Sequence, residues 1–346
     1  TASANVSVNA SDLATALASG NVQLAGNVVV KDPLTWSGNY VLTLGGTTTN
    51  TVAVNASVTA SGNTAGLVIK PATYSLSIKN AASISLSGTT PTLTIGGTNY
   101  TLIKSIANLA TVTASGNFAL AVPLNFTSGV TASPITVSFA GTLDGLGNTI
   151  NGLSITHTAA GATGLMKTLA GGTVRNLGIT NLLISLEPAA TTYNSNVGGL
   201  AGDTSGTATI DQVWSTGFMR VKSGSTYAGL AMGGLIGDVP NGSLTITKSW
   251  SSMNMNTWGS TYTNQVIGGL VGADVSTWPS TAATASGNIT MNQVYFTGDM
   301  QSPQKTGTHG QGGILGVHLG TGTVSITDAF SWAGIFIATG DTNYGG

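Results

Sequence analysis

The sequence predicts an all-β solenoid, and three observations carry this prediction. The 346-residue chain has 49 glycines and only 6% charged residues, so the helix-favouring residues Glu, Lys and Arg are scarce. Short alternating strands recur between turns of Gly, Asn, Ser and Thr. A glycine signature repeats along the C-terminal half. Together they predict a parallel β-helix, in which each turn stacks about 4.8 Å from the last.

Short strands with one apolar face each fill the first hundred residues. We predict strands at residues 28–30, 41–44, 52–54, 67–69, 76–78, 84–86 and 93–95. A sandwich or barrel could give this spacing, but the many strands and the longer repeat favour a coiled solenoid. At roughly 20 residues per turn the chain would make about 17 turns.

Two short helices are predicted at an internal repeat. The segment that begins at Asp12 recurs 96 residues later, from Asn108. In both copies an apolar stretch with helical spacing precedes a Ser-Gly-Asn turn and a strand. This predicts one helix that is capped by Ser11 and ends near Gly20, and a second helix around residues 103–109.

The most regular repeat is a glycine followed by Leu or Ile and then, two residues on, by another glycine. Three copies lie at intervals of 35 residues and a fourth follows after 44. The copies begin with Gly199 and Leu200, Gly234 and Leu235, Gly269 and Leu270, and Gly313 and Ile314. Repetition at a fixed period is typical of a solenoid. We expect glycines of the solenoid to fill corners where φ is positive.

An aromatic residue follows each copy of the signature at a similar distance. These residues are Trp214, Trp250, Tyr295 and Phe330. Stacked turns would place them above one another, which predicts an aromatic ladder in or against the core; the alternative is a platform for a sugar. As a buried aromatic, Trp250 would cost about 3–5 kcal/mol of stability on replacement by Ala.

Three further aromatic residues fall outside that register and are expected in loops. Trp278 belongs to an insertion in the third repeat, and insertions in solenoids often lie on the binding face. A candidate sugar-binding shelf therefore consists of Trp258, Tyr262 and Trp278, with Asn256 and Asn264 supplying hydrogen bonds. In the alternative, the Trp278 loop folds back and covers the flank of the solenoid.

Composition excludes several classes of function. A net charge of −1 with only ten Lys and Arg residues excludes an electrostatic nucleic-acid binder. No apolar run approaches the ~20 residues needed to span a bilayer, so we expect no membrane insertion. Because the chain has no cysteine, disulfides and thiolate metal sites are excluded.

Carboxylates and histidines give weak signals for chemistry. Asp203, Asp238 and Asp274 recur after the signature, which suggests either a carboxylate ladder around a cation or, as we favour, solvated turn-capping residues. His309 and His318 flank the fourth copy, with Asp299 and Asp328 as further metal ligands, but we favour surface polar residues here too. Clustered acids for sugar cleavage are lacking. We therefore expect no catalytic residue, metal or cofactor.

Several segments resemble a known family. Residues 10–22 and 32–44 look like the body of filamentous-haemagglutinin-type bacterial adhesins. Residues 139–150 and 171–178 are similar to the stretch that precedes GLUG repeats in those proteins, and the glycine signature resembles the GLUG motif itself. The resemblance implies a right-handed parallel β-helix, with residues 1–138 as the body and residues 139–346 as its GLUG-repeat continuation in one elongated body.

The same resemblance implies a large exoprotein, exported by two-partner secretion through an outer-membrane partner and displayed on or shed from a Gram-negative surface. The Asn-Pro-Asn-Leu element of that family's secretion domain is absent, so we expect a stalk or binding segment. The leading hypothesis is a non-enzymatic extracellular adhesin segment that binds glycan, host surface or matrix. The alternatives are a filament subunit that stacks end to end with copies of itself and, last, an enzyme acting on polysaccharide.

Overall fold

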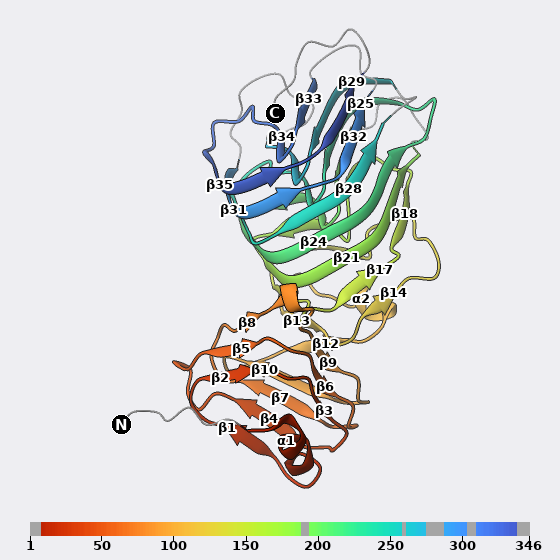
Figure 1. The fold of residues 1–346 in the computed structure, drawn as a ribbon. Helices are drawn as coiled ribbons and strands as arrows, with labels where there is room; N and C mark the ends of the chain where they lie inside the picture. The colour runs from red at the N-terminus through yellow and green to blue at the C-terminus, as the bar shows by residue number, and fades with distance from the viewer. Residues whose placement is uncertain (1–7, 188–193, 258–260, 275–286, 303–308, 338–346) are drawn as a thin grey trace. The chain divides into compact units, whose positions relative to one another are not determined.

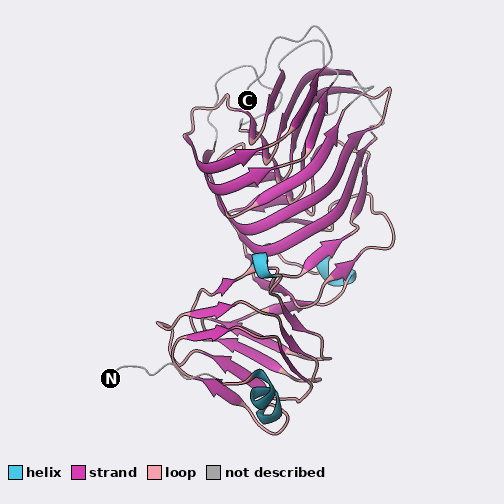
Figure 2. Cartoon of the chain, in the orientation of Figure 1, coloured by secondary structure: helices cyan, strands magenta, loops and turns pink. Residues whose placement is uncertain are grey.

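The computed structural model describes residues 8–187, 194–257, 261–274, 287–302 and 309–337. Nearly all of its regular structure is β-strand, and apart from β11, which pairs antiparallel with β10, the strands pair in parallel (Figures 1 and 2). The predicted all-β parallel solenoid is confirmed. The chain forms two compact units. The first unit comprises Thr1–Asn108, Gly116–Leu124 and Leu143–Thr149, and the second comprises Leu109–Ser115, Asn125–Thr142 and Ile150–Gly346.

The first unit has three columns of short strands. One column contains β1 (Val22–Leu24), β4 (Val41–Leu44), β7 (Gly66–Ile69) and β10 (Thr92–Ile95). The other columns contain β2 (Val28–Val30), β5 (Val52–Val54) and β8 (Ser75–Leu76), and β3 (Leu34–Trp36), β6 (Val58–Ala60) and β9 (Ile84–Leu86). Leu42, Leu67 and Leu93 lie side by side in register and are buried, so successive turns form one internal ladder.

Helices occur at both predicted places. They are α1 (Ala10–Ala16) and α2 (Ile106–Leu109). The expected cap at Ser11 is wrong: the backbone N–H of Leu13 already donates to the carbonyl of Asn9, so the helix begins earlier and Asn9 takes the N-cap position. The strand predicted at 76–78 also ends early, because η1 (Ile78–Asn80) forms a 3₁₀ turn that closes at Ala81, with φ of 53°.

The second unit also has three columns. The first contains β19 (Gly161–Thr163), β22 (Asn194–Gly198), β25 (Thr226–Gly233), β29 (Thr261–Gly268) and β33 (His309–Gly312). The second contains β15 (Ile135–Phe139), β20 (Met166–Ala170), β23 (Ala201–Ser205), β26 (Ile236–Asp238), β30 (Val271–Ala273) and β34 (Leu315–Val317).

The third column of this unit curves across the front of Figure 1 and contains the longest strands, β21 (Thr173–Leu186) and β24 (Thr207–Val221), and in later turns pairs of shorter strands that follow one another. These shorter strands are β27 (Ser243–Thr247), β28 (Trp250–Asn256), β31 (Asn288–Phe296), β32 (Asp299–Ser302), β35 (Val324–Ser331) and β36 (Gly334–Ile337). The remaining strands are β11 (Thr98–Asn99), β12 (Thr101–Ile103), β13 (Asn117–Leu120), β14 (Leu124–Asn125), β16 (Thr142–Asp144), β17 (Thr149–Asn151) and β18 (Ser154–His157).

One glycine repeat corresponds to one complete turn of the second unit. Ser195 lies beside Leu230, and Leu230 lies beside Gln265, each 35 residues further along the chain. The estimate of roughly 20 residues per turn is therefore wrong for this unit, and with it the estimate of about 17 turns. The reason is the long third column, whose β24 alone has 15 residues, whereas strands of the first unit have two to four.

Candidate functional site

The glycine signature forms the corner between the first two columns of the second unit. The backbone N–H of Leu200 donates to the carbonyl of Leu235 at 2.9 Å, and Leu235 donates in the same way to Leu270. Leu270 donates to Ile314, also at 2.9 Å. The side chains of the three leucines are fully buried. The repeated Leu or Ile of the signature is therefore an internal ladder.

The signature glycines are required by close contact rather than by positive φ. A Cβ at Gly199 would lie 2.3 Å from the carbonyl oxygen of Gly234, and one at Gly234 would lie 2.2 Å from that of Gly269. Neither glycine has a positive φ. The left-handed glycines lie elsewhere, for example Gly206 and Gly242, which precede the long strands.

The last glycine of the signature allows the backbones of the first and second columns to come into direct contact. A Cβ at Gly202 would lie 2.3 Å from the backbone nitrogen of Thr163, and one at Gly237 would lie 2.4 Å from that of Val197. The corner is also tied to the middle of β24, because the Ser215 hydroxyl donates to the carbonyl of Gly234 at 2.7 Å. The first two columns therefore form a thin double layer.

The four repeated aromatic residues form a ladder, as the sequence indicates. Trp214, Trp250, Tyr295 and Phe330 are successive partners in register. The ring centroids of Trp214 and Trp250 are 6.3 Å apart, and those of Trp250 and Tyr295 are 5.4 Å apart, with nearly parallel planes. The ladder lies on the outer face, however: Tyr295 is 37% and Phe330 is 55% exposed. The predicted stacking is confirmed, but Trp250 is only half-buried, so the expectation that it is a fully buried aromatic is wrong.

A left-handed residue in every turn explains why the rings face outward. Two positions before each aromatic lies a residue with φ between 48° and 55°: Gln212, Lys248, Gln293 or Asp328; Asn176 holds this position in β21. Ile210 and Val213 are both fully buried although they are three residues apart, so the simple alternation of the strand is broken there. These residues are all polar but differ in size and charge, and polar residues are abundant in this chain, so only their constant offset could have revealed them.

Stacking within the ladder limits what the rings can bind. A platform for a flat ligand needs open ring faces. The rings of Trp214 and Tyr295 lie on the two sides of Trp250, so this side chain turns its edge to the solvent. Phe330 is the last ring of the ladder in the described residues.

The predicted shelf is only partly visible. Trp258 and Trp278 lie outside the described residues, and Tyr262 lies in β29 with its side chain outside them. The amide of Asn256 donates to Oε1 of Gln301 in the next turn at 3.1 Å. The amide of Asn264 donates to the carbonyl of Ala228 in the preceding turn at 3.3 Å. Both Asn side chains link neighbouring turns, and the shelf remains a prediction.

Of the three repeated aspartates, two stand in register. Asp203 lies beside Asp238, but the next position in the column is Ala273, so Asp274 falls one residue further on. The amide of Asn196 donates to Oδ1 of Asp203 at 2.7 Å and lies 3.4 Å from Oδ2 of Asp238. Asp238 is 1% exposed, so the interpretation as solvated residues is wrong. Burial raises the pKa of Asp203.

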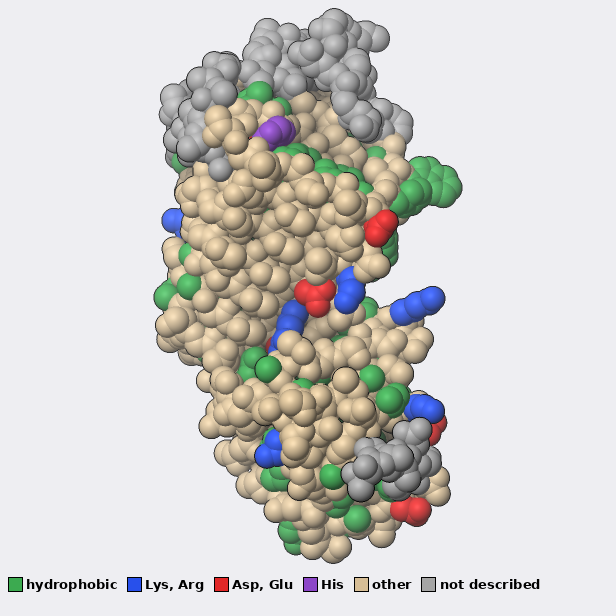
Figure 3. Space-filling model, turned by 90° about the vertical axis from the view of Figure 1, so that its left-hand side faces the viewer, with side chains coloured by type: hydrophobic (Ala, Val, Ile, Leu, Met, Phe, Trp, Pro, Cys, Tyr) green, Lys and Arg blue, Asp and Glu red, His purple; other side chains and the backbone are tan. Residues whose placement is uncertain are grey.

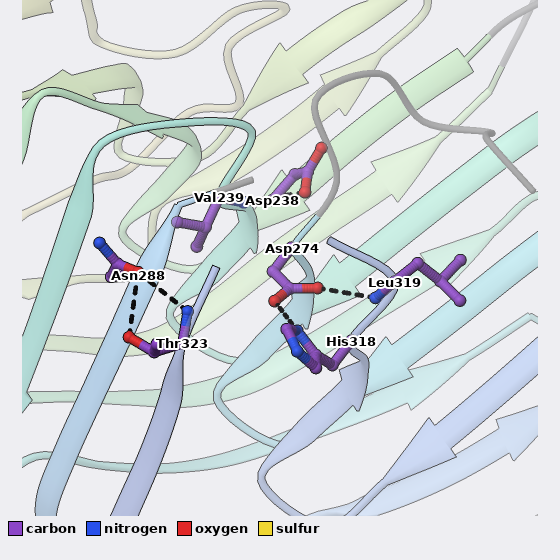
Figure 4. Close-up of polar contacts among 7 residues, drawn as sticks. All are labelled: Asp238, Val239, Asp274, Asn288, His318, Leu319 and Thr323. Carbon is purple, nitrogen blue, oxygen red and sulfur yellow. Dashed lines mark hydrogen bonds and ion pairs between the residues drawn. The ribbon is translucent and has the colours of Figure 1, made fainter. Parts of the chain in front are cut away.

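Asp274 contacts His318, as Figure 4 shows. The Asp274 carboxylate is fully buried, accepts the backbone N–H of Leu319 at 3.1 Å and contacts Nδ1 of His318. Burial raises the pKa of Asp274, and the bond from His318 offsets this in part. The contact joins the ends of β30 and β34, and sequence reasoning missed it because the partners are 44 residues apart.

The other members of the suggested metal set do not join this pair. The side chain of His309 lies outside the described residues. Asp299 and Asp328 are both exposed, and Asp328 lies 3.4 Å from the amide of Asn292. Within the described residues, no three His, Cys, Asp or Glu side chains are grouped so that they could hold a metal ion.

Comparisons with known proteins find little. None of the helices in the described part of the chain is long and apolar enough to cross a membrane. No family model and no solved structure matches the chain. A stretch of 148 residues, 41% of this chain, is 33% identical to halomucin of Haloquadratum walsbyi. The chain spans about 1% of the length of that curated relative. It is therefore similar to a small part of a very long protein that is named as a mucin.

Proposed function

We propose that this chain is a non-enzymatic segment of an extracellular cell-surface protein that attaches to glycan, host surface or matrix. The proposal includes membership of the filamentous-haemagglutinin type with GLUG repeats, and secretion through an outer-membrane partner. The observation that carries it is the outer face of the third column in the second unit, where one polar position and one aromatic position recur in four successive turns.

The polar position forms a ladder beside the rings. Asp211, Thr247, Asn292 and Thr327 are successive partners in register. The Thr247 hydroxyl donates to Asp211 at 2.7 Å, and the Asn292 amide donates to Thr327 at 2.7 Å. Such a face offers repeated donors and acceptors, and Asp211 is the one ionisable residue among these four positions. The side of the molecule that faces the viewer in Figure 3 likewise carries few charged side chains. Many weak polar contacts of this kind suit a sugar chain or a matrix surface.

The similarity to halomucin supports an extracellular role, because its name describes a mucin. The chain's composition agrees with this: it has no cysteine and 6% charged residues.

Retention of the purified chain on glycan arrays and on immobilised matrix tests the proposal. We expect binding that falls on Asn292→Ala in the polar ladder. The matched control is Thr35→Ala, an exposed strand position in the first unit, which should leave binding unchanged. Retention on none of these surfaces contradicts the proposal, and release of reducing ends from a polysaccharide contradicts its non-enzymatic part.

The second candidate function is a filament subunit that stacks end to end. One observation favours it: the strands of successive turns pair in parallel throughout the columns of the second unit, and a further copy of the chain can continue a stack of this kind. Negative-stain microscopy tests this candidate, since filaments would lengthen with protein concentration.

A further inference from the structure

A second row of hydroxyl groups lies on the outer face of the third column, two residues before the polar ladder. Its members are successive partners in register: Thr173, Thr209, Thr245, Thr290 and Ser325. All five side chains are half-buried or exposed. Because strands of neighbouring turns lie about 4.8 Å apart, this threonine ladder repeats one hydroxyl at that distance across the turns of the second unit.

The hydroxyls of the threonine ladder are available to a ligand, whereas the polar ladder bonds partly to itself. In the polar ladder, Thr247 donates to Asp211 and Asn292 donates to Thr327, both at 2.7 Å. Within the described residues, no side-chain hydrogen bond involves any member of the threonine ladder. Threonine is branched at Cβ and has few χ1 rotamers in a strand, so a ligand that binds its hydroxyl orders little that is not already ordered.

The charges of this face favour a neutral ligand. Arg175 lies beside Asp211 in register, at the start of the polar ladder. Among the left-handed residues next to that ladder, Lys248 is basic and Asp328 is acidic. Acidic polysaccharides are attracted by clustered Lys and Arg, and here the two basic side chains are matched by two acidic ones. The face therefore gives no net attraction to a polyanion, and its uncharged hydroxyls suit an uncharged partner.

The spacing of the two ladders favours a straight, flat chain of sugars. A glycan with equatorial 1,4-bonds is an extended ribbon, and each sugar advances it by nearly the distance between neighbouring turns. The ladders are two residues apart along each strand, about 6.6 Å, so they can hold both edges of such a ribbon. Successive sugars turn opposite edges to the same side, and a threonine hydroxyl can bond either edge because it both donates and accepts. A glycan with axial 1,4-bonds coils and leaves the row.

We propose that the threonine ladder binds a neutral, linear glycan of equatorially 1,4-linked sugars, which lies across the turns of the second unit with one sugar at each turn. The inference rests on the proposed function, attachment to glycan, and specifies the class of glycan. A single hydrogen bond between neutral groups contributes little. Affinity therefore depends on the number of turns that one glycan chain engages.

Titration calorimetry of the full chain with soluble glucose oligomers tests the linkage and the spacing. We expect the association constant to rise with each added sugar from cellobiose to cellopentaose. Maltopentaose contains the same sugars joined by axial bonds and should bind at least about tenfold more weakly than cellopentaose. Equal binding of the two pentamers overturns the proposal. So does an affinity that stops rising at cellotriose, because a compact pocket and not a ladder would then hold the ligand.

A further outcome separates this inference from the proposed function on which it rests. Chitopentaose, a second neutral ribbon with equatorial 1,4-bonds, is titrated beside cellopentaose. If neither pentamer binds while the glycan array retains the chain on other glycans, attachment to glycan stands and the inference is wrong.

Variants of equal shape test the ladder itself. Thr245→Val removes the hydroxyl but keeps the branched side chain, so the circular dichroism spectrum should not change. We expect the affinity for cellopentaose to fall about threefold to tenfold, as for the loss of one neutral hydrogen bond. Thr209→Val and Thr290→Val should act alike, because their positions are equivalent. The matched control is Thr59→Val, a half-buried strand position of the first unit, which should leave binding unchanged. Unchanged binding in all three ladder variants, or an equal loss in the control, overturns the proposal.

Discussion

The two units of this chain close a turn of parallel strands in opposite ways. The first unit fills its interior with side chains, and one continuous buried cluster runs from Leu13 and Leu17 to the leucines of β7 and β10. The second unit also buries large apolar side chains, among them Phe139 and Phe296, but it brings two of its three columns together by leaving side chains out, through Gly202 and Gly237. The difference shows that neighbouring columns of a β-helix can be held together by close backbone contact at glycines as well as by packed apolar side chains.

The pairing of the columns in the second unit explains the small cluster found there. Ala231, Val266 and Ala273 fill the space between the two thin layers, with Val317 and Leu319 packed against them. Near them lie Asn196, Asp203 and Asp238, whose hydrogen bonds satisfy buried polar groups. A layer this thin has room for small side chains or for paired polar ones.

The largest expected effect tests whether the signature corner is as much a core as the interior of the first unit. Leu67→Ala in the first unit and Leu235→Ala in the second should each lower the free energy of unfolding by about 2–5 kcal/mol, because both side chains are fully buried. Urea unfolding followed by circular dichroism measures this. A cost below ~1 kcal/mol for Leu235→Ala alone would mean that the corner packs more loosely than we describe.

The next effect concerns backbone contact. Gly237→Ala should cost about 3 kcal/mol, because its Cβ would meet the backbone of Val197 at 2.4 Å and neither strand can shift without breaking its ladder. The control is Gly20→Ala in the first unit, where nothing lies within 4 Å of the added Cβ. That variant should change stability by no more than ~0.5 kcal/mol. If the two substitutions lower the free energy of unfolding equally, close backbone contact at Gly237 does not stabilise the second unit.

A smaller effect distinguishes an outer ring from an inner one. Trp250→Ala should cost about 1–3 kcal/mol, since it loses two stacked contacts of about 0.5–1.5 kcal/mol each. Trp36 of the first unit is buried, with 3% of its surface exposed. Trp36→Ala should therefore lower the free energy of unfolding by about 3–5 kcal/mol. Thermal or urea unfolding of the two variants gives the comparison, and the reverse order would place Trp250 inside the core.

The smallest effect is a dependence of the free energy of unfolding on pH, caused by two buried carboxyl groups of the second unit. Burial raises the pKa of Asp203 and Asp274 above the ordinary 3.8, so the folded state holds their protons more tightly than the unfolded state. Their contribution to stability is therefore complete below pH 3.8 and decreases as pH rises through the raised pKa. Asp203→Asn and Asp274→Asn should each make the decrease shallower. If the free energy of unfolding falls with pH as steeply in both variants as in the unchanged protein, Asp203 and Asp274 are not the cause of the decrease.

Much of the fold could be predicted because repetition is visible in the sequence. Equal spacing of Gly199, Gly234 and Gly269 indicates stacking, and the aromatic residues follow in the same order that the ladder shows. The turn length could not be deduced, since the long strands combine several apolar stretches that resemble separate short strands. Gln212 and its counterparts reverse the expected alternation through backbone conformation, and their shared polar character is too common in this chain to reveal it.

The candidate site was less accessible to prediction. Asp238 carries a charged side chain and follows a glycine, a pattern typical of a solvated turn, yet the thin double layer buries it. The contact between Asp274 and His318 depends on the offset between two neighbouring turns, one of which carries the insertion. Spacing along the chain does not encode such an offset.

The equality of one repeat and one turn has a consequence for how this protein can change. Excision of residues 199–233 would join Gly198 to Gly234, which occupies the same point of the circumference as Gly199, so every remaining partner would keep its register. Duplication of a 35-residue segment would likewise leave the register of strand pairing unchanged. Recombination between such similar stretches of a gene can therefore lengthen or shorten the molecule in whole steps, and natural variants are expected to differ in repeat number before they differ in architecture.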